Sequence, residues 1–226
     1  MLTPSIIRNV FPVKNGKRTG TCFTIDYDTI QYFVTAKHII KNLQNGNCVE
    51  FLISGNLIKT NVKTIGHHHT ADVSVFTIND HPELQGLKFH IKETEPGQDV
   101  HLIGFPTGTG ARKSDQSKKK YPQQLIKKAT VSRIINNNTD KYLLLNGINN
   151  PGFSGGPVIL KDPTDRTFKV AAVISGHKPD ETIYPDKKVS PVSIRNRTGI
   201  ILAYSVENVL ELIENLNAQP GCSSNI

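Results

Sequence analysis

Cysteine is scarce in this sequence, and long apolar runs are missing from it. Three cysteines occur in 226 residues, at positions 22, 48 and 222. Their number is odd and their spacing is not that of metal ligands, which argues against a disulfide scaffold. No stretch approaches the roughly 18 to 20 consecutive apolar residues of a membrane-spanning helix, so no membrane span is predicted.

A secretory leader pattern is also missing, because the first residues lack a basic region followed by a hydrophobic one. Unpaired thiols fit a reducing compartment. The sequence therefore predicts a cytoplasmic location, while secretion after removal of a precursor segment stays open. It leaves the oligomeric state open as well.

Positive charge is in excess, with 27 Lys and Arg against 19 Asp and Glu, a net charge of +8 and a pI of about 9.4. Such an excess suits anionic partners such as nucleic acid. Much of it lies in the segment 112–128, around Lys118, Lys119 and Lys120. We interpret this segment as a solvated loop, and no nucleic-acid partner is predicted because no recognised nucleic-acid-binding module is visible.

Glycine and proline are plentiful and scattered, at 17 and 13 residues, while apolar runs stay short. This favours short strands joined by tight turns, and hence an all-β fold. Strand candidates before residue 81 are 19–27, 30–40, 48–53, 58–65 and 73–78. Those of a second series are 99–105, 124–135, 141–147, 154–160, 168–176 and 198–205.

The two series of strands predict two barrels. The candidate catalytic residues described below are divided between them. We place the first barrel at residues 1–80, a linker at 81–96 and the second barrel at 97–204. Apolar residues at helical spacing predict a C-terminal helix over 205–216, followed by a tail at 217–226.

The strongest chemical signal is the segment PGFSGGP at 151–157, which sets Ser154 in a glycine-rich turn before an apolar strand. A nucleophile must stand clear of the backbone, and acyl transfer needs amide N–H groups directed at the developing oxyanion. His38, in VTAKHII, is a candidate base, and Asp72, just before an apolar strand, is a candidate partner for it. Each signal is modest alone, but together they predict one site between two barrels.

These motifs resemble those of the trypsin-like, chymotrypsin-fold serine proteases, and within them the disulfide-free HtrA-type peptidases. VTAKHII resembles the family's TAxH motif, TADVSVFTI its aspartate strand and PGFSGGPVI its GxSGGP motif. The resemblance covers nearly the whole chain. It implies two six-stranded antiparallel β-barrels and a serine endopeptidase that cleaves proteins or peptides without a cofactor.

The resemblance also implies site residues. His38, Asp72 and Ser154 would form the triad, and the amides of Gly152 and Ser154 the oxyanion hole. Residues expected around the substrate pocket are Ile148, Ile174, Ser175, Gly176 and His177. Because Ile148 and the strand residues Ile174, Ser175 and Gly176 supply no charge, we expect cleavage after an apolar or small residue. The alternative is a preference for acidic residues, recognised by His177.

One departure from the family pattern and two alternatives accompany this interpretation. Phe153 stands where many relatives carry an aspartate that pairs with a freed N-terminus, so activation by that salt bridge is not available. His67, His68 and His69 invite a metal hypothesis, but adjacent residues point in different directions and no metal is predicted. The alternative to an enzyme is a catalytically silent binding module on a protease fold.

Overall fold

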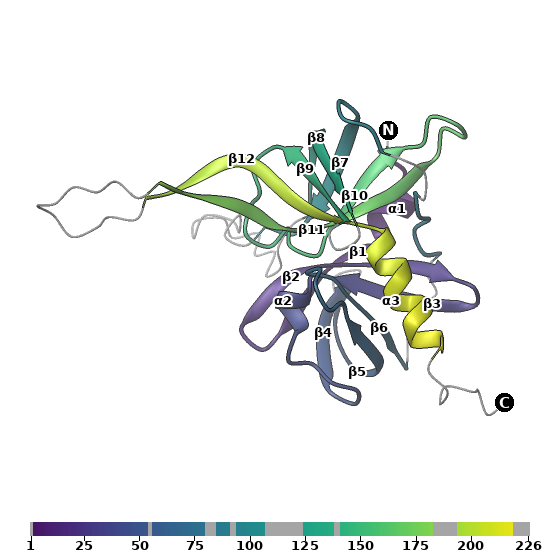
Figure 1. Ribbon diagram of the computed structural model, residues 1–226. Helices are drawn as coiled ribbons and strands as arrows, with labels where there is room; N and C mark the ends of the chain where they lie inside the picture. The colour runs from purple at the N-terminus through teal and green to yellow at the C-terminus, as the bar shows by residue number, and fades with distance from the viewer. Residues whose placement is uncertain are drawn as a thin grey trace, which may run out of the picture.

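The computed structural model of this chain contains two closed β-barrels, one above the other in Figure 1. The structure describes residues 2–53, 56–79, 85–90, 94–106, 124–137, 141–182 and 194–218. Within these ranges, only the backbone is described for residues 52, 53, 56, 177–182 and 194–198. No helix within these ranges is long and apolar enough to cross a membrane.

The first barrel follows a short helix α1 (Pro4–Arg8) and closes in the order β1-β2-β3-β6-β5-β4. All of its paired neighbours are antiparallel. Its strands are β1 (Val10–Asn15), β2 (Arg18–Tyr27), β3 (Ile30–Thr35), β4 (Cys48–Ile53), β5 (Asn56–His67) and β6 (Ser74–Ile78), with the single-turn helix α2 (Lys37–Ile40) after β3.

The second barrel closes in the order β10-β11-β12-β9-β8-β7, again with antiparallel neighbours. The outer parts of β11 and β12 extend away from the barrel in Figure 1. The strands are β7 (Asp99–Gly104), β8 (Leu125–Asn136), β9 (Lys141–Asn146), β10 (Pro157–Lys161), β11 (Phe168–Thr182) and β12 (Ile194–Ser205). The predicted all-β fold of two six-stranded barrels is thus confirmed.

Each barrel has its own apolar core, and a third core joins them. Four phenylalanines fill the first barrel, with ring centroids 5.3 to 6.3 Å apart: Phe11, Phe33, Phe51 and Phe76. The joining core contains residues of both barrels and of the C-terminal helix, among them Val34, Ile103 and Val209. The two barrels are therefore held face to face by buried apolar surface, the largest stabilising term in folding.

The predicted C-terminal helix is α3 (Glu207–Ala218), two residues later than expected at each end. Although it follows the second barrel, it packs against the first. A Cβ on Gly66 of β5 would lie 3.0 to 3.2 Å from side-chain atoms of Leu212 and Leu216, so the helix packs closely over this glycine. Within the linker, Leu87 bridges to Ile25 and Phe89 bridges to Val170, one contact with each barrel.

One predicted strand, 30–40, ends early. The chain leaves β3 at Thr35 and forms α2, in which Ile39 and Ile40 are 4% and 0% exposed. On a strand these adjacent side chains would point to opposite faces, whereas one helical turn lets both enter the core. Burying each contributes about 1.5–3 kcal/mol. The correction matters because this turn carries His38.

Candidate active site

His38 is presented to solvent by the two isoleucines that anchor α2. Its side chain is 47% exposed, while the residues after it are buried in the first barrel. The backbone N–H of Lys37 donates to the carbonyl oxygen of Asp72 at 3.3 Å, which ties the turn to the start of β6. The imidazole is therefore held on a rigid element beside a carboxylate.

Asp72 accepts three hydrogen bonds from two residues. Its Oδ1 accepts from the backbone N–H of His38 at 2.8 Å, and its Oδ2 lies 2.6 Å from His38 Nδ1. Ser175 Oγ donates to the same Oδ2 at 2.6 Å. Burial alone raises the pKa of Asp72, but the hydrogen bonds from His38 and Ser175 outweigh it and hold that pKa below its ordinary value. An ionised carboxylate only accepts, so an Nδ1 proton of His38 faces Asp72, and in the neutral ring Nε2 then carries the lone pair.

Ser154 lies in the turn between β9 and β10, where the two barrels meet. Gly152 and Gly155, on either side of it, have φ angles of +98° and +84°. A Cβ on Gly155 would lie 2.1 Å from the carbonyl oxygen of Thr21 and 2.2 Å from Thr35 Oγ1, so only glycine fits there. The turn is thus shaped by its packing on the first barrel.

Thr21 fastens this turn from β2. Its hydroxyl donates to the carbonyl oxygen of Gly152 at 2.7 Å and accepts from the N–H of Phe105 at 3.0 Å. Its backbone N–H donates to the carbonyl oxygen of Ser154 at 2.8 Å. Among the described residues, neither the N–H of Gly152 nor that of Ser154 donates a hydrogen bond, which leaves both available to an anion.

The nucleophile, base and acid candidates are connected through Ser175. Ser154 Oγ donates to the carbonyl oxygen of Ser175 at 2.7 Å, and the Ser175 hydroxyl in turn donates to Asp72. His38 and Ser154 border one pocket of about 430 Å³. The hydroxyl of Ser154 thus bonds to a carbonyl of β11 in this resting arrangement, with the imidazole across the pocket.

The five residues expected at the substrate pocket are in different environments. Ile174 is fully buried in the second barrel, whereas Ile148 is 58% exposed. Gly176 is half-buried and pairs with Leu202 of β12. Ser175 turns its hydroxyl to Asp72, a contact that the sequence did not indicate. The side chain of His177 lies outside the described residues.

Basic residues line the pocket that His38 and Ser154 share. Its described lining includes Arg18 of β2 and Lys41, which follows α2, and contains no carboxylate. Both cations lie on the side of His38 that belongs to the first barrel. This pocket is therefore positively charged beside the candidate nucleophile.

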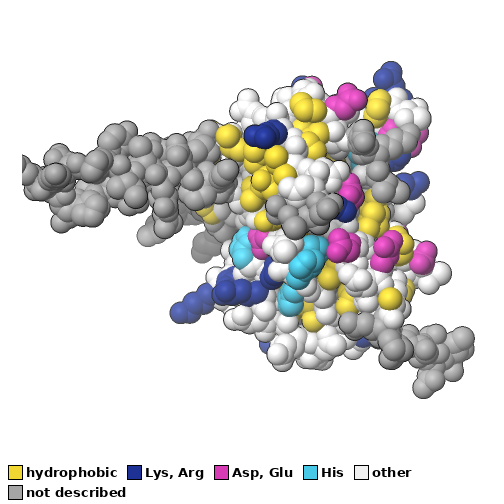
Figure 2. All heavy atoms as spheres, in the orientation of Figure 1, with side chains coloured by type: hydrophobic (Ala, Val, Ile, Leu, Met, Phe, Trp, Pro, Cys, Tyr) yellow, Lys and Arg dark blue, Asp and Glu magenta, His cyan; other side chains and the backbone are white. Residues whose placement is uncertain are grey.

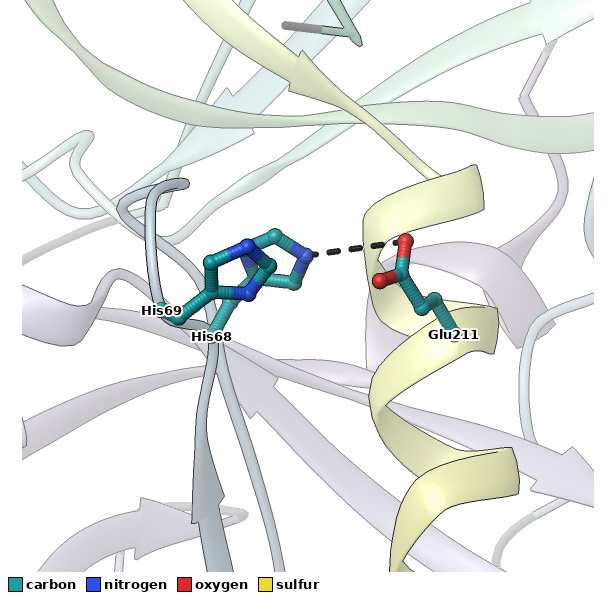
Figure 3. A group of neighbouring side chains, drawn as sticks. All are labelled: His68, His69 and Glu211. Carbon is teal, nitrogen blue, oxygen red and sulfur yellow. Dashed lines mark ion pairs between the residues drawn. The ribbon is translucent and has the colours of Figure 1, made fainter. Parts of the chain in front are cut away.

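His68 and His69 form a cluster with Glu211 of α3, within reach of a shared metal ion (Figure 3). Their rings stack with centroids 4.7 Å apart, so these two neighbours do not point in different directions as expected. The ring of His67 points elsewhere, because its Nδ1 lies 2.6 Å from Ser74 Oγ. Histidine and acidic side chains gather along the middle of the face shown in Figure 2.

The hydrogen bonding of His68 favours a neutral ring that faces Glu211 over metal ligation. Its Nδ1 accepts from the N–H of Ala71 at 2.9 Å, so a neutral ring carries its proton on Nε2, 3.8 Å from a Glu211 oxygen. A ligating Nε2 needs its lone pair, which would break the bond from Ala71. Burial lowers the pKa of His68, and Glu211 offsets this only in part.

The basic segment 112–128 is described only from residue 124 onward. There Lys128 pairs with Asp99 at 2.7 Å on the surface of the second barrel. The predicted loop residues Lys118, Lys119 and Lys120 lie outside the described residues.

The comparisons with known proteins identify the family and the fold. The family model of the trypsin-like peptidase domain matches residues 20–164. No curated protein sequence matches the chain. The chain belongs to the trypsin-like peptidase family, and it is a serine endopeptidase, a hydrolase.

Solved structures share the fold at low sequence identity. The Rv3671c protease from M. tuberculosis in its active form is 16% identical, with a TM-score of 0.64 over 96% of this chain and 85% of that one. The HtrA-type protease AlgW, solved with a tripeptide, is 14% identical, with a TM-score of 0.66 over 94% and 61%. The serine endoprotease from Yersinia pestis is 17% identical, with a TM-score of 0.62 over 96% and 67%.

Proposed function

We propose that the chain cleaves peptide bonds with Ser154 as nucleophile, His38 as general base and Asp72 as the group that orients the base. The observation that carries this is the double hold of Asp72 on His38, through Nδ1 at 2.6 Å and through the backbone N–H at 2.8 Å. That hold fixes the tautomer in which Nε2 can take a proton.

In the proposed reaction Ser154 Oγ attacks the scissile carbonyl while His38 Nε2 takes its proton. The N–H groups of Gly152 and Ser154 stabilise the negative charge on the substrate oxygen. His38 then protonates the leaving amine, and water hydrolyses the acyl-enzyme with the same base. Asp72 stays ionised throughout and stabilises the imidazolium form of His38.

Before attack, the Ser154 hydroxyl must leave its hydrogen bond to Ser175. Rotation about its Cα–Cβ bond moves Oγ between staggered positions, and catalytic hydrogen bonds often tighten only when substrate is bound. The carbonyl of Ser175 therefore serves as a resting acceptor for the nucleophile.

The proposed substrate preference concerns the residues on both sides of the cut bond. On the acyl side we propose an apolar or small residue, since the described residues Ile148, Ile174 and Gly176 supply no charge there; acidic residues read by His177 are the rival. On the leaving-group side Arg18 and Lys41 favour an acidic residue, because the shared pocket contains two cations and no described carboxylate.

The test is labelling by a fluorophosphonate probe, which reports an activated serine without needing the substrate. We expect wild type to label and Ser154→Ala and His38→Ala to lose labelling while keeping the wild-type fold by circular dichroism. A folded wild type that does not label would contradict the proposal and favour the binding module.

A further inference from the structure

Lys127 of β8 contacts the segment that precedes Ser154. Its Nζ donates to the carbonyl oxygen of Ile148 at 2.9 Å and to Oδ1 of Asn150. The same ammonium lies 5.2 Å from the centre of the Phe153 ring, the geometry of a cation–π contact. One half-buried side chain thus contacts three residues of one segment.

Individual contacts hold that segment, among them those of Thr21 with Gly152 and Ser154 near its end. Residues 147–156 connect β9 to β10 and form no strand or helix. Toward its start, the Gly147 N–H donates to Gly199, and further along Phe153 N–H donates to the carbonyl oxygen of Asn150 at 3.1 Å. A segment without a strand ladder depends on such individual contacts for its order. It also carries both proposed oxyanion donors.

We propose that Lys127 is a positioning residue, whose ammonium holds residues 148–153 so that the amides of Gly152 and Ser154 stay directed at the oxyanion. The proposal rests on the proposed function. Lys127 acts through the segment and does not contact the reacting atoms. Its charge strengthens the hydrogen bonds it donates, which a neutral side chain could not match.

Recognition of a substrate carboxylate is the competing role for this cation. Two of its donors are already bonded to oxygens of the chain itself, and its ammonium lies over the ring of Phe153, a residue with 1% exposure. A lysine that reads substrate would instead direct its donors into an open pocket. The contacts therefore favour bracing of the segment.

The next residue supplies a matched control. Lys128 follows Lys127 on β8, so its side chain points to the opposite face, where it pairs with Asp99 and is 64% exposed. Lys128→Met removes the same charge from the same strand without touching residues 147–156. Lys127→Arg keeps the cation and its donors.

The experiment uses the full chain and compares Lys127→Met, Lys127→Arg and Lys128→Met with wild type. Two quantities are measured: the labelling rate with a fluorophosphonate that has no peptide side chain, and hydrogen–deuterium exchange over residues 147–156. We expect Lys127→Met to label about 10- to 100-fold more slowly, up to the loss typical of one oxyanion donor. Exchange in the segment should rise, Lys127→Arg should recover most of both, and Lys128→Met should match wild type.

Wild-type labelling and exchange in Lys127→Met would overturn the proposal. So would an effect confined to KM for peptides with acidic side chains, since the probe has none. If Lys127→Met does not fold, Asn150→Ala removes one acceptor and should raise exchange on its own. Failure of the proposed function looks different: wild type would not label, while the exchange comparison would still show whether Lys127 orders the segment.

Discussion

Ser175 contacts two members of the proposed triad with its two oxygens. Its hydroxyl donates to Asp72 and its carbonyl accepts from Ser154, each at 2.6 to 2.7 Å. It thereby lowers the pKa of Asp72 and holds the nucleophile away from the base. A single residue of β11 thus affects both the charge of the acid and the resting position of the serine.

Removing the Ser175 hydroxyl should weaken the fold in a pH-dependent way. The pKa of Asp72 is lowered by folding, so its contribution to stability is present above the unfolded pKa of about 3.9 and is lost as pH falls through the folded value. Ser175→Ala should cost about 1–3 kcal/mol at pH 7. Urea unfolding at pH 7 and near pH 2 measures this. The cost should shrink at low pH, and an equal cost at both values would contradict the role of Asp72.

The candidate triad could be predicted from the sequence because each member lies in a short motif, whereas the contacts of Ser175 could not. From the sequence, Ser175 was expected only in the wall of the substrate pocket. A bulge in β11 between Ile174 and Gly176 re-aims the side chain at this point. Lys127 escaped notice for a related reason, since the alternation of a strand does not tell which distant segment a long side chain reaches.

At the scale of elements, the turn that carries Ser154 is shaped by a neighbour from the other barrel. Thr21 and Thr35 of the first barrel occupy the space where any side chain at position 155 would lie. The close approach also explains the buried bond from Thr21 to the Gly152 carbonyl. The site therefore requires both barrels to be packed together.

Gly155→Ala should consequently abolish fluorophosphonate labelling and lower the unfolding temperature. The added Cβ meets backbone as well as side-chain oxygen at 2.1 and 2.2 Å, on top of the strain of a φ of +84°. Gly16→Ala separates the two effects, because its φ is +59° but nothing lies within 4 Å of the added carbon. That control should lose about 1 kcal/mol and keep its labelling. Equal losses in both variants would mean that strain alone matters.

The sequence predicted five strands of the first barrel and missed β1. Proline removes a ladder donor, so a run containing Pro12 is not expected to be a strand. The structure accommodates it because Pro12 pairs with Thr21 of β2, while pairing with β4 begins only at Val13. The sequence failed to predict α2 for another reason. Adjacent apolar residues such as Ile39 and Ile40 are typical of a buried strand, and the sequence does not show that both side chains enter the same core.

At the scale of the whole molecule, two of the excess positive charges lie beside the candidate active site. The net charge of +8 did not indicate where an anionic partner would bind. The structure places Arg18 and Lys41 in the pocket beside His38 and Ser154, where we propose that the leaving group binds. An enzyme with this field should draw acidic peptides to its site, and salt should weaken that effect.

Charge reversal in this pocket tests the leaving-group preference directly. The double variant Arg18→Glu, Lys41→Glu should lower kcat/KM about tenfold for peptides with an acidic residue after the cut bond, and leave peptides with a neutral residue there nearly unchanged. Lys17→Glu is the control, because Lys17 is adjacent and exposed but does not line the pocket. Cleavage of paired peptides at 50 and 500 mM salt gives the measurement. An equal loss for both peptides would point to damage of the site, and an equal loss in the Lys17 variant would assign the effect to net charge alone.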